Sequence, residues 1–180
     1  MGKNKQIVLG VTASVAIYKA CELVRRLRGD NFDVTVVMTQ DSKKLILPQL
    51  FEAVSGNKVY SGMFEESVEW DIKHISLAQK ADLVLIAPAS ANCIAKIAAG
   101  ICDDLLFCVV CATRAPVVIC PAMNEQMFLN KITQGNIQKL DKLGYHFVLP
   151  RKGNLACGKR GVGCLAEVEA IAKEAQRLLG

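Results

Sequence analysis

A short polar stretch, residues 121–128 (PAMNEQMF), contains the first side chain that could do chemistry. It follows the apolar run 116–120, which has the length and composition of a buried strand. The amide of Asn124 offers both a donor and an acceptor, so it could hold a carboxylate or an amide of a ligand. Asn is also a common helix cap, and Asn124 as the cap of a following helix is the structural alternative.

Hydroxyl and amide side chains follow three other apolar runs in the same way. These turns begin after residues 10, 38 and 87, and their polar members include Ser14, Thr39, Ser42, Ser90 and Asn92. A turn between a strand and a helix can bind an anion through its backbone N–H groups. The chain has neither the GxGxxG dinucleotide fingerprint nor a P-loop lysine in these turns. A mononucleotide held by Ser14 and backbone amides fits the pattern, and an ordinary turn capped by Ser14 is the alternative.

Two histidines and eight cysteines are the remaining reactive side chains. His74 lies at a junction between a polar stretch and a short predicted helix, where it is either structural or a general base. His146 lies in a late strand pattern and is interpreted as a packed or edge residue. Cys108 and Cys111 have CxxC spacing, but their apolar neighbours indicate core packing rather than a metal or redox site. We therefore expect no metal site. The cysteines also do not form a disulfide framework, so we expect a reducing, cytoplasmic environment.

Alternating strands and helices must position these residues. Strands are predicted at 6–10, 33–38, 81–87, 116–120 and 145–149, each but the last followed by a helical pattern. This alternation predicts an α/β three-layer sandwich with a mainly parallel sheet, formed as a single domain over 1–180. Parallel strands would bring the four polar turns to one edge of the sheet.

Several other segments complete the prediction. Residues 61–73 are predicted as a loop, and 151–163 as a glycine-rich basic loop or flap. The apolar segment 105–112 fits a helix or a strand by periodicity, and two preceding Asp residues favour a helix. The helix predicted for 130–143 would direct Ile132, Ile137 and Leu140 inward, and a last helix spans 166–179.

Composition excludes several classes of protein. The chain has 180 residues, 52% of them hydrophobic, and a net charge of +5. Its basic residues are scattered and aromatic residues are sparse, so we expect no nucleic-acid partner. No apolar run approaches 18 residues, and the first apolar run is needed as a strand, so we expect neither a membrane span nor a signal peptide. A small anionic ligand is compatible with the charge.

Four motifs together resemble those of a known family. Residues 121–128 resemble the PxMNxxMW signature of the flavin-containing cysteine decarboxylases. Residues 88–92 (PASAN) resemble their PASANT flavin segment, and residues 74–75 resemble their active-site histidine motif. Residues 155–158 (LACG) resemble the ACGD motif of the phosphopantothenoylcysteine decarboxylase branch.

The resemblance runs from Gln6 to the closing helix, with two departures. Phe128 stands where the signature has Trp, and Lys159 stands where the ACGD motif has Asp. The resemblance implies a Rossmann/flavodoxin-like sheet and FMN as the cofactor. Implied FMN contacts are Ala13, Ser14, Val15, Thr39, Ser42, Ser90, Ala91, Asn92, Cys93 and Ala122.

The implied reaction is decarboxylation of 4′-phosphopantothenoylcysteine to 4′-phosphopantetheine in coenzyme A biosynthesis. The substrate thiol would be oxidised to a thioaldehyde, CO₂ would leave, and the enethiol would then be reduced. His74 would act as the base in the oxidation. Asn124, with Met123 beside it, would hold the substrate carboxylate or its adjacent amide. Cys157 would donate a proton from a flap whose hinges are Gly153, Gly158, Gly161 and Gly163.

The resemblance also implies partners and two alternatives. The family forms trimers, often assembled into dodecamers, so a homotrimer or homododecamer is expected, with flavin near a subunit interface. We expect a separate phosphopantothenate–cysteine ligase, because 180 residues leave no room for a ligase domain. The alternative activities are a peptidyl-cysteine decarboxylase of lantibiotic maturation and a non-catalytic regulatory flavoprotein subunit.

Overall fold

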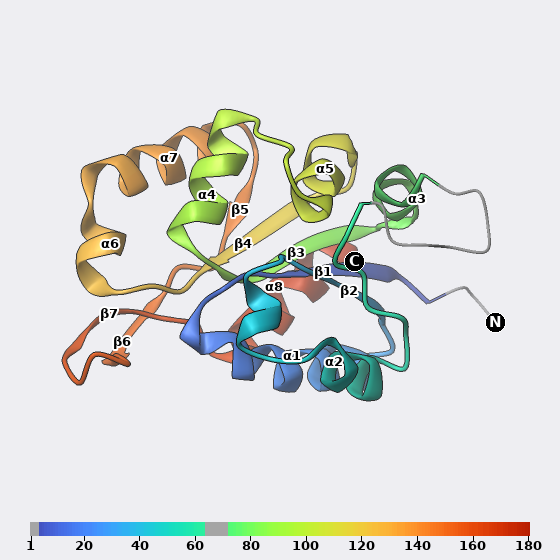
Figure 1. Ribbon diagram of the computed structural model, residues 1–180, viewed down its shortest axis with the longest axis horizontal. Coiled ribbons are helices and arrows are strands. Elements are labelled where there is room, and N and C mark those ends of the chain that lie inside the picture. The colour runs from blue at the N-terminus through green and yellow to red at the C-terminus, as the bar shows by residue number, and fades with distance from the viewer. Residues whose placement is uncertain (1–3, 64–71) are drawn as a thin grey trace.

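The computed structural model describes residues 4–63 and 72–180, so part of the loop predicted for 61–73 lies outside the described residues. Its main sheet has five parallel strands in the order β2-β1-β3-β4-β5 (Figure 1). They are β1 (Gln6–Val11), β2 (Asp33–Met38), β3 (Leu83–Ala89), β4 (Val117–Pro121) and β5 (His146–Phe147). The parallel sheet and its flanking helices confirm the predicted fold class.

Helices cover both faces of the sheet and make three layers (Figure 1). One face carries α1 (Tyr18–Gly29), α2 (Pro48–Ser55) and α8 (Val168–Leu179). The other carries α3 (Lys73–Lys80), α4 (Ala91–Ala99), α5 (Leu105–Ala112) and α7 (Lys131–Lys142). The described residues also form three short helices, namely η1 (Val15–Ile17), η2 (Ser42–Lys44) and α6 (Glu125–Leu129). No helix in the described part of the chain combines the length and the apolar character needed to cross a membrane.

The central strand β3 shows why these segments form a parallel sheet. All seven of its residues are buried, because helices cover it on both sides. Alternate side chains enter opposite layers: Leu83 and Leu85 join the core beneath α1 and α8, while Val84 and Ile86 join the core beneath α4 and α5. A nearly continuous apolar run is therefore the pattern that this position requires.

Side-chain caps fix where five of the described helices begin. In each case a side-chain oxygen accepts a hydrogen bond from a backbone N–H in the first turn. The caps are Ser14 for η1, Ser90 for α4, Asp104 for α5, Asn124 for α6 and Asn130 for α7. The Asp104 cap confirms that 105–112 is a helix and not a strand.

Three local predictions are wrong. Ile132 is 75% exposed in the first turn of α7, so only Ile137 and Leu140 of the predicted trio pack inward. Cys108 is half-buried and Cys111 is exposed, because α5 turns both away from the sheet rather than into the core. The last strand of the sheet has only two residues instead of the predicted 145–149.

Residues 151–163 do not form a loop. They belong to an antiparallel hairpin of β6 (Arg151–Asn154) and β7 (Arg160–Cys164), which forms a separate two-stranded sheet. Its glycines do not provide the predicted set of hinges. Gly161 and Gly163 are buried against other segments, and Gly158 has a φ of +79° in the tight turn between the two strands.

Two hydrogen bonds fasten this hairpin to the turn after β4 and to the start of α6. The backbone N–H of Met123 donates to the carbonyl of Gly163 at 3.0 Å. The N–H of Val162 donates to Glu125 Oε1, also at 3.0 Å. A Cβ on Gly163 would lie 2.1 Å from the Met123 carbonyl oxygen, so only glycine permits this close approach.

Replacing Gly163 should therefore loosen the hairpin. Gly163→Ala combines a backbone clash with a φ of +141°, and we expect it to lower the free energy of unfolding by about 1–3 kcal/mol. Chemical denaturation measures this change, and protease cleavage near 155–160 should become faster.

Gly135→Ala is the matched control. Gly135 is exposed in α7 with nothing within 4 Å of an added Cβ, so alanine should raise the stability by roughly 0.5–1 kcal/mol. Equal effects of the two substitutions would contradict the docking role of Gly163.

Candidate functional site

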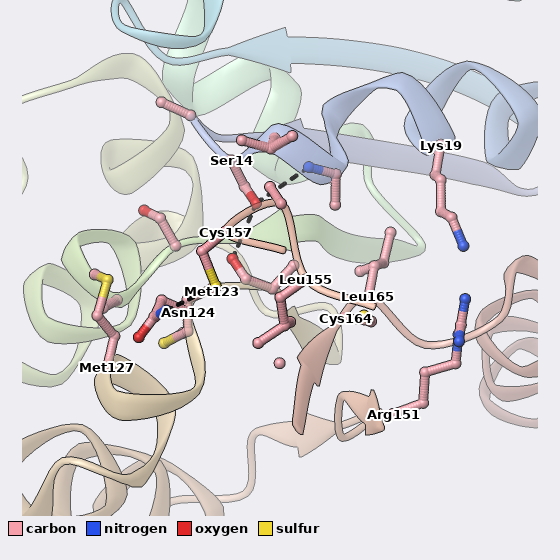
Figure 2. Close-up of a pocket in the computed structure, with 18 of the residues that line it drawn as sticks. Ser14, Lys19, Met123, Asn124, Met127, Arg151, Leu155, Cys157, Cys164 and Leu165 are labelled. Carbon is pink, nitrogen blue, oxygen red and sulfur yellow. Dashed lines mark hydrogen bonds between the residues drawn. The ribbon is translucent and has the colours of Figure 1, made fainter. Parts of the chain in front are cut away.

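A cavity of about 540 Å³ opens at the carboxyl edge of the main sheet (Figure 2). Its walls come from the turns after β1, β3 and β4 and from the β6–β7 hairpin. Ligands of open parallel sheets bind at this edge, because the helix-starting turns converge there. Most of the wall is apolar, and the polar side chains at its surface include Ser14, Lys19, Ser90, Asn124, Arg151, Asn154 and Cys157.

A smaller and more polar hollow of about 230 Å³ adjoins the first cavity. The two share Ala13 and Ser90 in their walls. The hollow is otherwise lined by residues of the turns after β2 and β3 and of the segment before α5, including Thr39, Asp41, Asn92, Cys93, Lys96, Asp103 and Asp104. An apolar chamber and a polar hollow therefore meet at one point.

Ser14 connects two of the turns that build the larger cavity. Its hydroxyl donates to the Ala122 carbonyl at 3.0 Å and accepts from the N–H of Ala16 at 3.4 Å (Figure 2). The turn after β1 is thus tied to the turn after β4, although the two are more than a hundred residues apart in sequence. Ser14 is both a helix cap and a cavity residue, so the two interpretations of its role are compatible.

Asn124 and Cys157 lie next to each other toward one end of the cavity (Figure 2). Asn124 Oδ1 accepts from the Gln126 N–H at 2.9 Å, which caps α6 and fixes the orientation of the amide. Its Nδ2 group lies 3.7 Å from Cys157 Sγ, as the donor of a weak hydrogen bond. Cys157 is exposed in the turn of the hairpin, where the N–H of Gly158 donates to the carbonyl of Leu155. The cap leaves the NH₂ group directed at the cavity as a donor.

Nine of the ten residues implied as FMN contacts line the two cavities. The larger one is lined by Ala13, Ser14, Val15, Ser90, Ala91 and Ala122. The smaller one is lined by Ala13, Thr39, Ser90, Asn92 and Cys93. Ser42 lines neither, since it is fully buried and donates through Oγ to the Thr39 carbonyl at 2.7 Å. Ser42 therefore supports the turn that carries Thr39.

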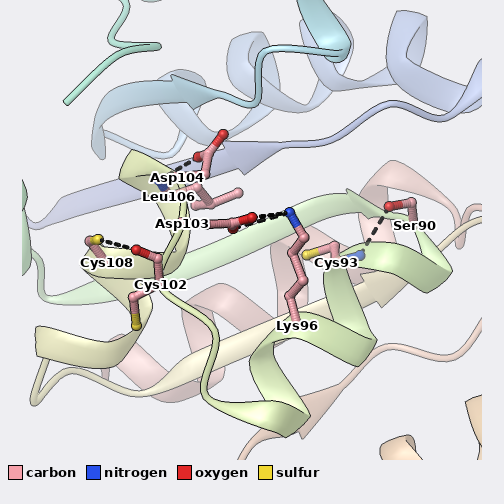
Figure 3. A network of polar contacts seen from close by, with 8 residues as sticks. All are labelled: Ser90, Cys93, Lys96, Cys102, Asp103, Asp104, Leu106 and Cys108. Carbon is pink, nitrogen blue, oxygen red and sulfur yellow. Dashed lines mark hydrogen bonds and ion pairs between the residues drawn. The ribbon is translucent and has the colours of Figure 1, made fainter. Parts of the chain in front are cut away.

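The smaller hollow is lined by three acids and one lysine, and the lysine is paired with one of the acids (Figure 3). Lys96 Nζ contacts both carboxylate oxygens of Asp103, at 3.0 and 2.7 Å. Burial raises the pKa of Asp104, whose carboxylate also accepts the capping bond from Leu106. Complete burial raises the pKa of the Cys93 thiol, so this sulfur stays protonated and acts as a packing group.

His74 does not join the other two implied catalytic residues. It is half-buried near the start of α3 and lines neither cavity. Figure 1 shows α3 at the opposite end of the molecule from α6 and the hairpin. Asn124 and Cys157 are brought together within one chain, and His74 is not.

The larger cavity also contains residues that were not predicted from the sequence. Lys19 and Arg151 lie at its rim, and Glu125 anchors the hairpin behind it. Lysine at the second position of an amphipathic helix and arginine in a basic segment look like ordinary surface residues in a sequence. The signal for Lys19 was that it lies within two turns of Ser14, and the signal for Arg151 was its place in a basic flap segment, which could meet the substrate phosphate or be solvated surface.

Comparisons with known proteins agree with this geometry. A coenzyme A biosynthesis bifunctional protein CoaBC from Vibrio cholerae serotype O1 is 46% identical over 164 residues, which cover 91% of this chain and 41% of that protein. A probable phosphopantothenoylcysteine decarboxylase from Streptococcus mutans serotype c is 41% identical over 178 residues, or 98% of this chain and 99% of that protein. The chain thus spans about two-fifths of the length of its bifunctional relatives.

Solved structures share the fold along nearly the whole chain. A cysteine-to-serine mutant of a PPC decarboxylase complexed with pantothenoylaminoethenethiol has a TM-score of 0.85 and 32% identity, covering 97% of this chain and 98% of that one. The FMN-dependent cysteine decarboxylase SpaF also has a TM-score of 0.85, at 29% identity, covering 98% of both chains.

The match to a family is equally extensive. The family described as Flavoprotein matches residues 1–180. Together with the FMN-dependent decarboxylases among the similar structures, it supports a flavin as the cofactor. On this match, and on relatives that are more than 40% identical, this chain belongs to the flavoprotein family.

Proposed function

We propose that this chain decarboxylates 4′-phosphopantothenoylcysteine to 4′-phosphopantetheine with FMN, in the cytoplasmic synthesis of coenzyme A. One observation carries the proposal, namely that a cavity at the carboxyl edge of the sheet holds Asn124 and Cys157 within 3.7 Å of each other. The pair combines a donor for the substrate with a thiol that can supply a proton. The names of the Streptococcus mutans relative and of the PPC decarboxylase structure support the same reaction.

The linings of the two cavities suit the two parts of FMN. FMN has a flat ring that suits the apolar cavity, and its polar chain ends in a phosphate that could meet the hydroxyls of Thr39 and Ser90 in the smaller hollow. The turn at Ser90, which both cavities share, opens into the first turn of α4, where backbone N–H groups favour anions. The flavin ring would then be held by Ser14, Val15, Ala91 and Ala122. The phosphate-bearing chain would be held by Thr39 and Asn92.

Loss of CO₂ from the substrate requires an electron sink, which an α-amido acid lacks. Removing a hydride from Cβ and a proton from sulfur gives a thioaldehyde, and this group accepts the electron pair that CO₂ leaves behind. When bound, FMN supplies the chemistry that takes up and later returns the hydride. The Nδ2 donor of Asn124 would meanwhile hold the departing carboxylate or the neighbouring amide in line with that sink.

The second half of the reaction saturates the enethiol. Its carbon–carbon double bond gains a hydride at Cβ and a proton at Cα, and Cys157 would donate that proton. The hairpin places the thiol over the cavity, and its anchors at Met123 and Glu125 hold it there. The same hairpin would limit the access of water to the reacting atoms.

His74 would come from a second copy of the chain. It lies away from the cavity of its own chain, while the reaction needs a base beside the substrate. A homotrimer or homododecamer with shared sites would bring the two together. The ligase step that precedes this reaction would be carried out outside residues 1–180, as the length of the bifunctional relatives suggests.

Product analysis by mass spectrometry tests the proposal. FMN-loaded protein supplied with 4′-phosphopantothenoylcysteine should yield 4′-phosphopantetheine, which is the substrate minus CO₂. A peptidyl-cysteine decarboxylase would instead release an unreduced enethiol from a peptide with a carboxyl-terminal cysteine. A protein that leaves 4′-phosphopantothenoylcysteine intact would contradict the proposal.

Cys157→Ser should separate the two half-reactions. We expect CO₂ release to continue, while reduction of the enethiol falls by about 10²-fold or more because its proton donor is missing. The accumulating product should be lighter than 4′-phosphopantetheine by two hydrogens. Normal formation of the saturated thiol would show that another group is the acid.

His74→Asn should retain flavin and lose CO₂ release by roughly 10²- to 10⁴-fold, the range for loss of a general base. Co-expression with Cys157→Ser then tests whether subunits share sites. A mixed oligomer would contain some sites that combine His74 of one subunit with Cys157 of the other, so full turnover should return. Mixtures that remain inactive would contradict shared sites.

A further inference from the structure

The outer end of the larger cavity carries two cations that face each other. Lys19 and Arg151 approach from opposite sides (Figure 2), and both line the cavity. A single carboxylate, Glu167, is shared between them, 3.9 Å from Lys19 Nζ and 2.7 Å from Arg151 Nε. The two positive charges and one negative charge leave a net charge of about +1 at this end.

Three separate elements hold these side chains in place. Lys19 is the second residue of α1, and its side chain is only 17% exposed. Arg151 is the first residue of β6, where it pairs with Cys164 in the hairpin that Met123 anchors. Glu167 precedes α8 as its N-terminal cap residue and is 62% exposed. The cations are thus positioned by packed elements, whereas their shared acid is the most solvated member.

Two other cations of the described chain are more fully compensated. Arg26 has two acids, Asp30 and Glu169, and Lys96 has both oxygens of Asp103. Lys19 and Arg151 have the reverse ratio of cations to acids. Among the ion pairs of the described residues, these two cations share one acid. A guanidinium and an ammonium on either side of one space are suited to a dianion such as a phosphomonoester.

We propose that Lys19 and Arg151 form the subsite for the phosphate of the substrate. This inference rests on the proposed function, in which the substrate has a thiol and a carboxylate at one end and a phosphomonoester at the other. Asn124 and Cys157 lie toward one end of the cavity and the two cations toward the other (Figure 2). The subsite would let the enzyme prefer a phosphorylated substrate over an unphosphorylated one or a peptide.

A phosphomonoester could also come from FMN, and the location of the cations argues against that source. Thr39, Ser90 and Asn92 line the smaller hollow, which adjoins the larger cavity at Ala13 and Ser90. Lys19 and Arg151 line only the larger cavity. The flavin phosphate is assigned to the hollow, and the substrate phosphate to the two cations.

Binding calorimetry on the FMN-loaded protein tests this assignment, with 4′-phosphopantetheine and pantetheine as probes. The natural chain should bind the phosphorylated compound at least about tenfold more tightly. Lys19→Met with Arg151→Met should reduce that preference to about twofold or less, while the affinity for pantetheine stays the same. Methionine preserves the apolar stem of each side chain, and Arg151→Lys should retain part of the preference because it keeps the charge.

Lys152→Met is the matched control, since Lys152 is an exposed neighbour of Arg151 that does not line the cavity. It should keep the full preference for phosphate. A double variant that keeps the preference, or that loses affinity for both probes equally, would overturn the inference. So would a double variant that binds riboflavin as before but FMN more weakly, because the cations would then hold the cofactor phosphate.

Turnover separates this inference from the proposed function. If the natural chain releases CO₂ from 4′-phosphopantothenoylcysteine and the double variant still prefers it over pantothenoylcysteine, only the phosphate subsite is wrong. If the natural chain releases CO₂ from neither compound, the proposed function is wrong, and the inference that rests on it is overturned as well.

Discussion

One main-chain hydrogen bond, from the N–H of Met123 to the carbonyl of Gly163, joins the edge of the parallel sheet to the β6–β7 hairpin. It requires a residue without a side chain at position 163, because a Cβ there would meet the Met123 carbonyl. The position of Cys157 beside Asn124, and of Arg151 across from Lys19, both depend on this attachment. A small sheet that is separate from the main one thus becomes a wall of the cavity.

The other walls follow from the direction of the strands. Since β1, β3 and β4 are parallel, the turns that follow them lie at one edge, and short bonds connect these turns. Thr12 Oγ1 donates to the Pro88 carbonyl at 2.8 Å, and Ala122 N–H donates to the Ala89 carbonyl at 3.0 Å. With the Ser14–Ala122 bond, these contacts make a continuous frame in which a ligand meets a fixed set of backbone groups.

The sequence was informative where local chemistry decides the structure. Apolar runs located the five strands, and cap residues such as Ser90 and Asp104 located the starts of helices. The hairpin was missed because Arg-Lys-Gly-Asn lacks the alternation of a strand, and its pairing depends on contacts with α6. Ile132 was wrongly predicted to be buried. Helical spacing shows which side chains share a face of a helix, but it does not show how far along that face the neighbouring elements extend.

The candidate site was predictable to a similar extent. Strand polarity brought Ser14, Ser90 and Asn124 to one edge, as the sequence implied. Strand polarity could not place His74, because the position of His74 depends on how α3 packs against its neighbours. It also could not distinguish Lys19 from the many surface lysines. Both depend on tertiary packing, which brings distant segments together without a local signal.

Hydrogen–deuterium exchange of the protein with and without FMN tests the central claim, that one edge of the sheet holds the cofactor. The account predicts slower exchange in the turns 12–16, 39–42, 89–93 and 121–124, with little change in α2 and α8. Protection located in α2 or α8, with these turns unchanged, would contradict it.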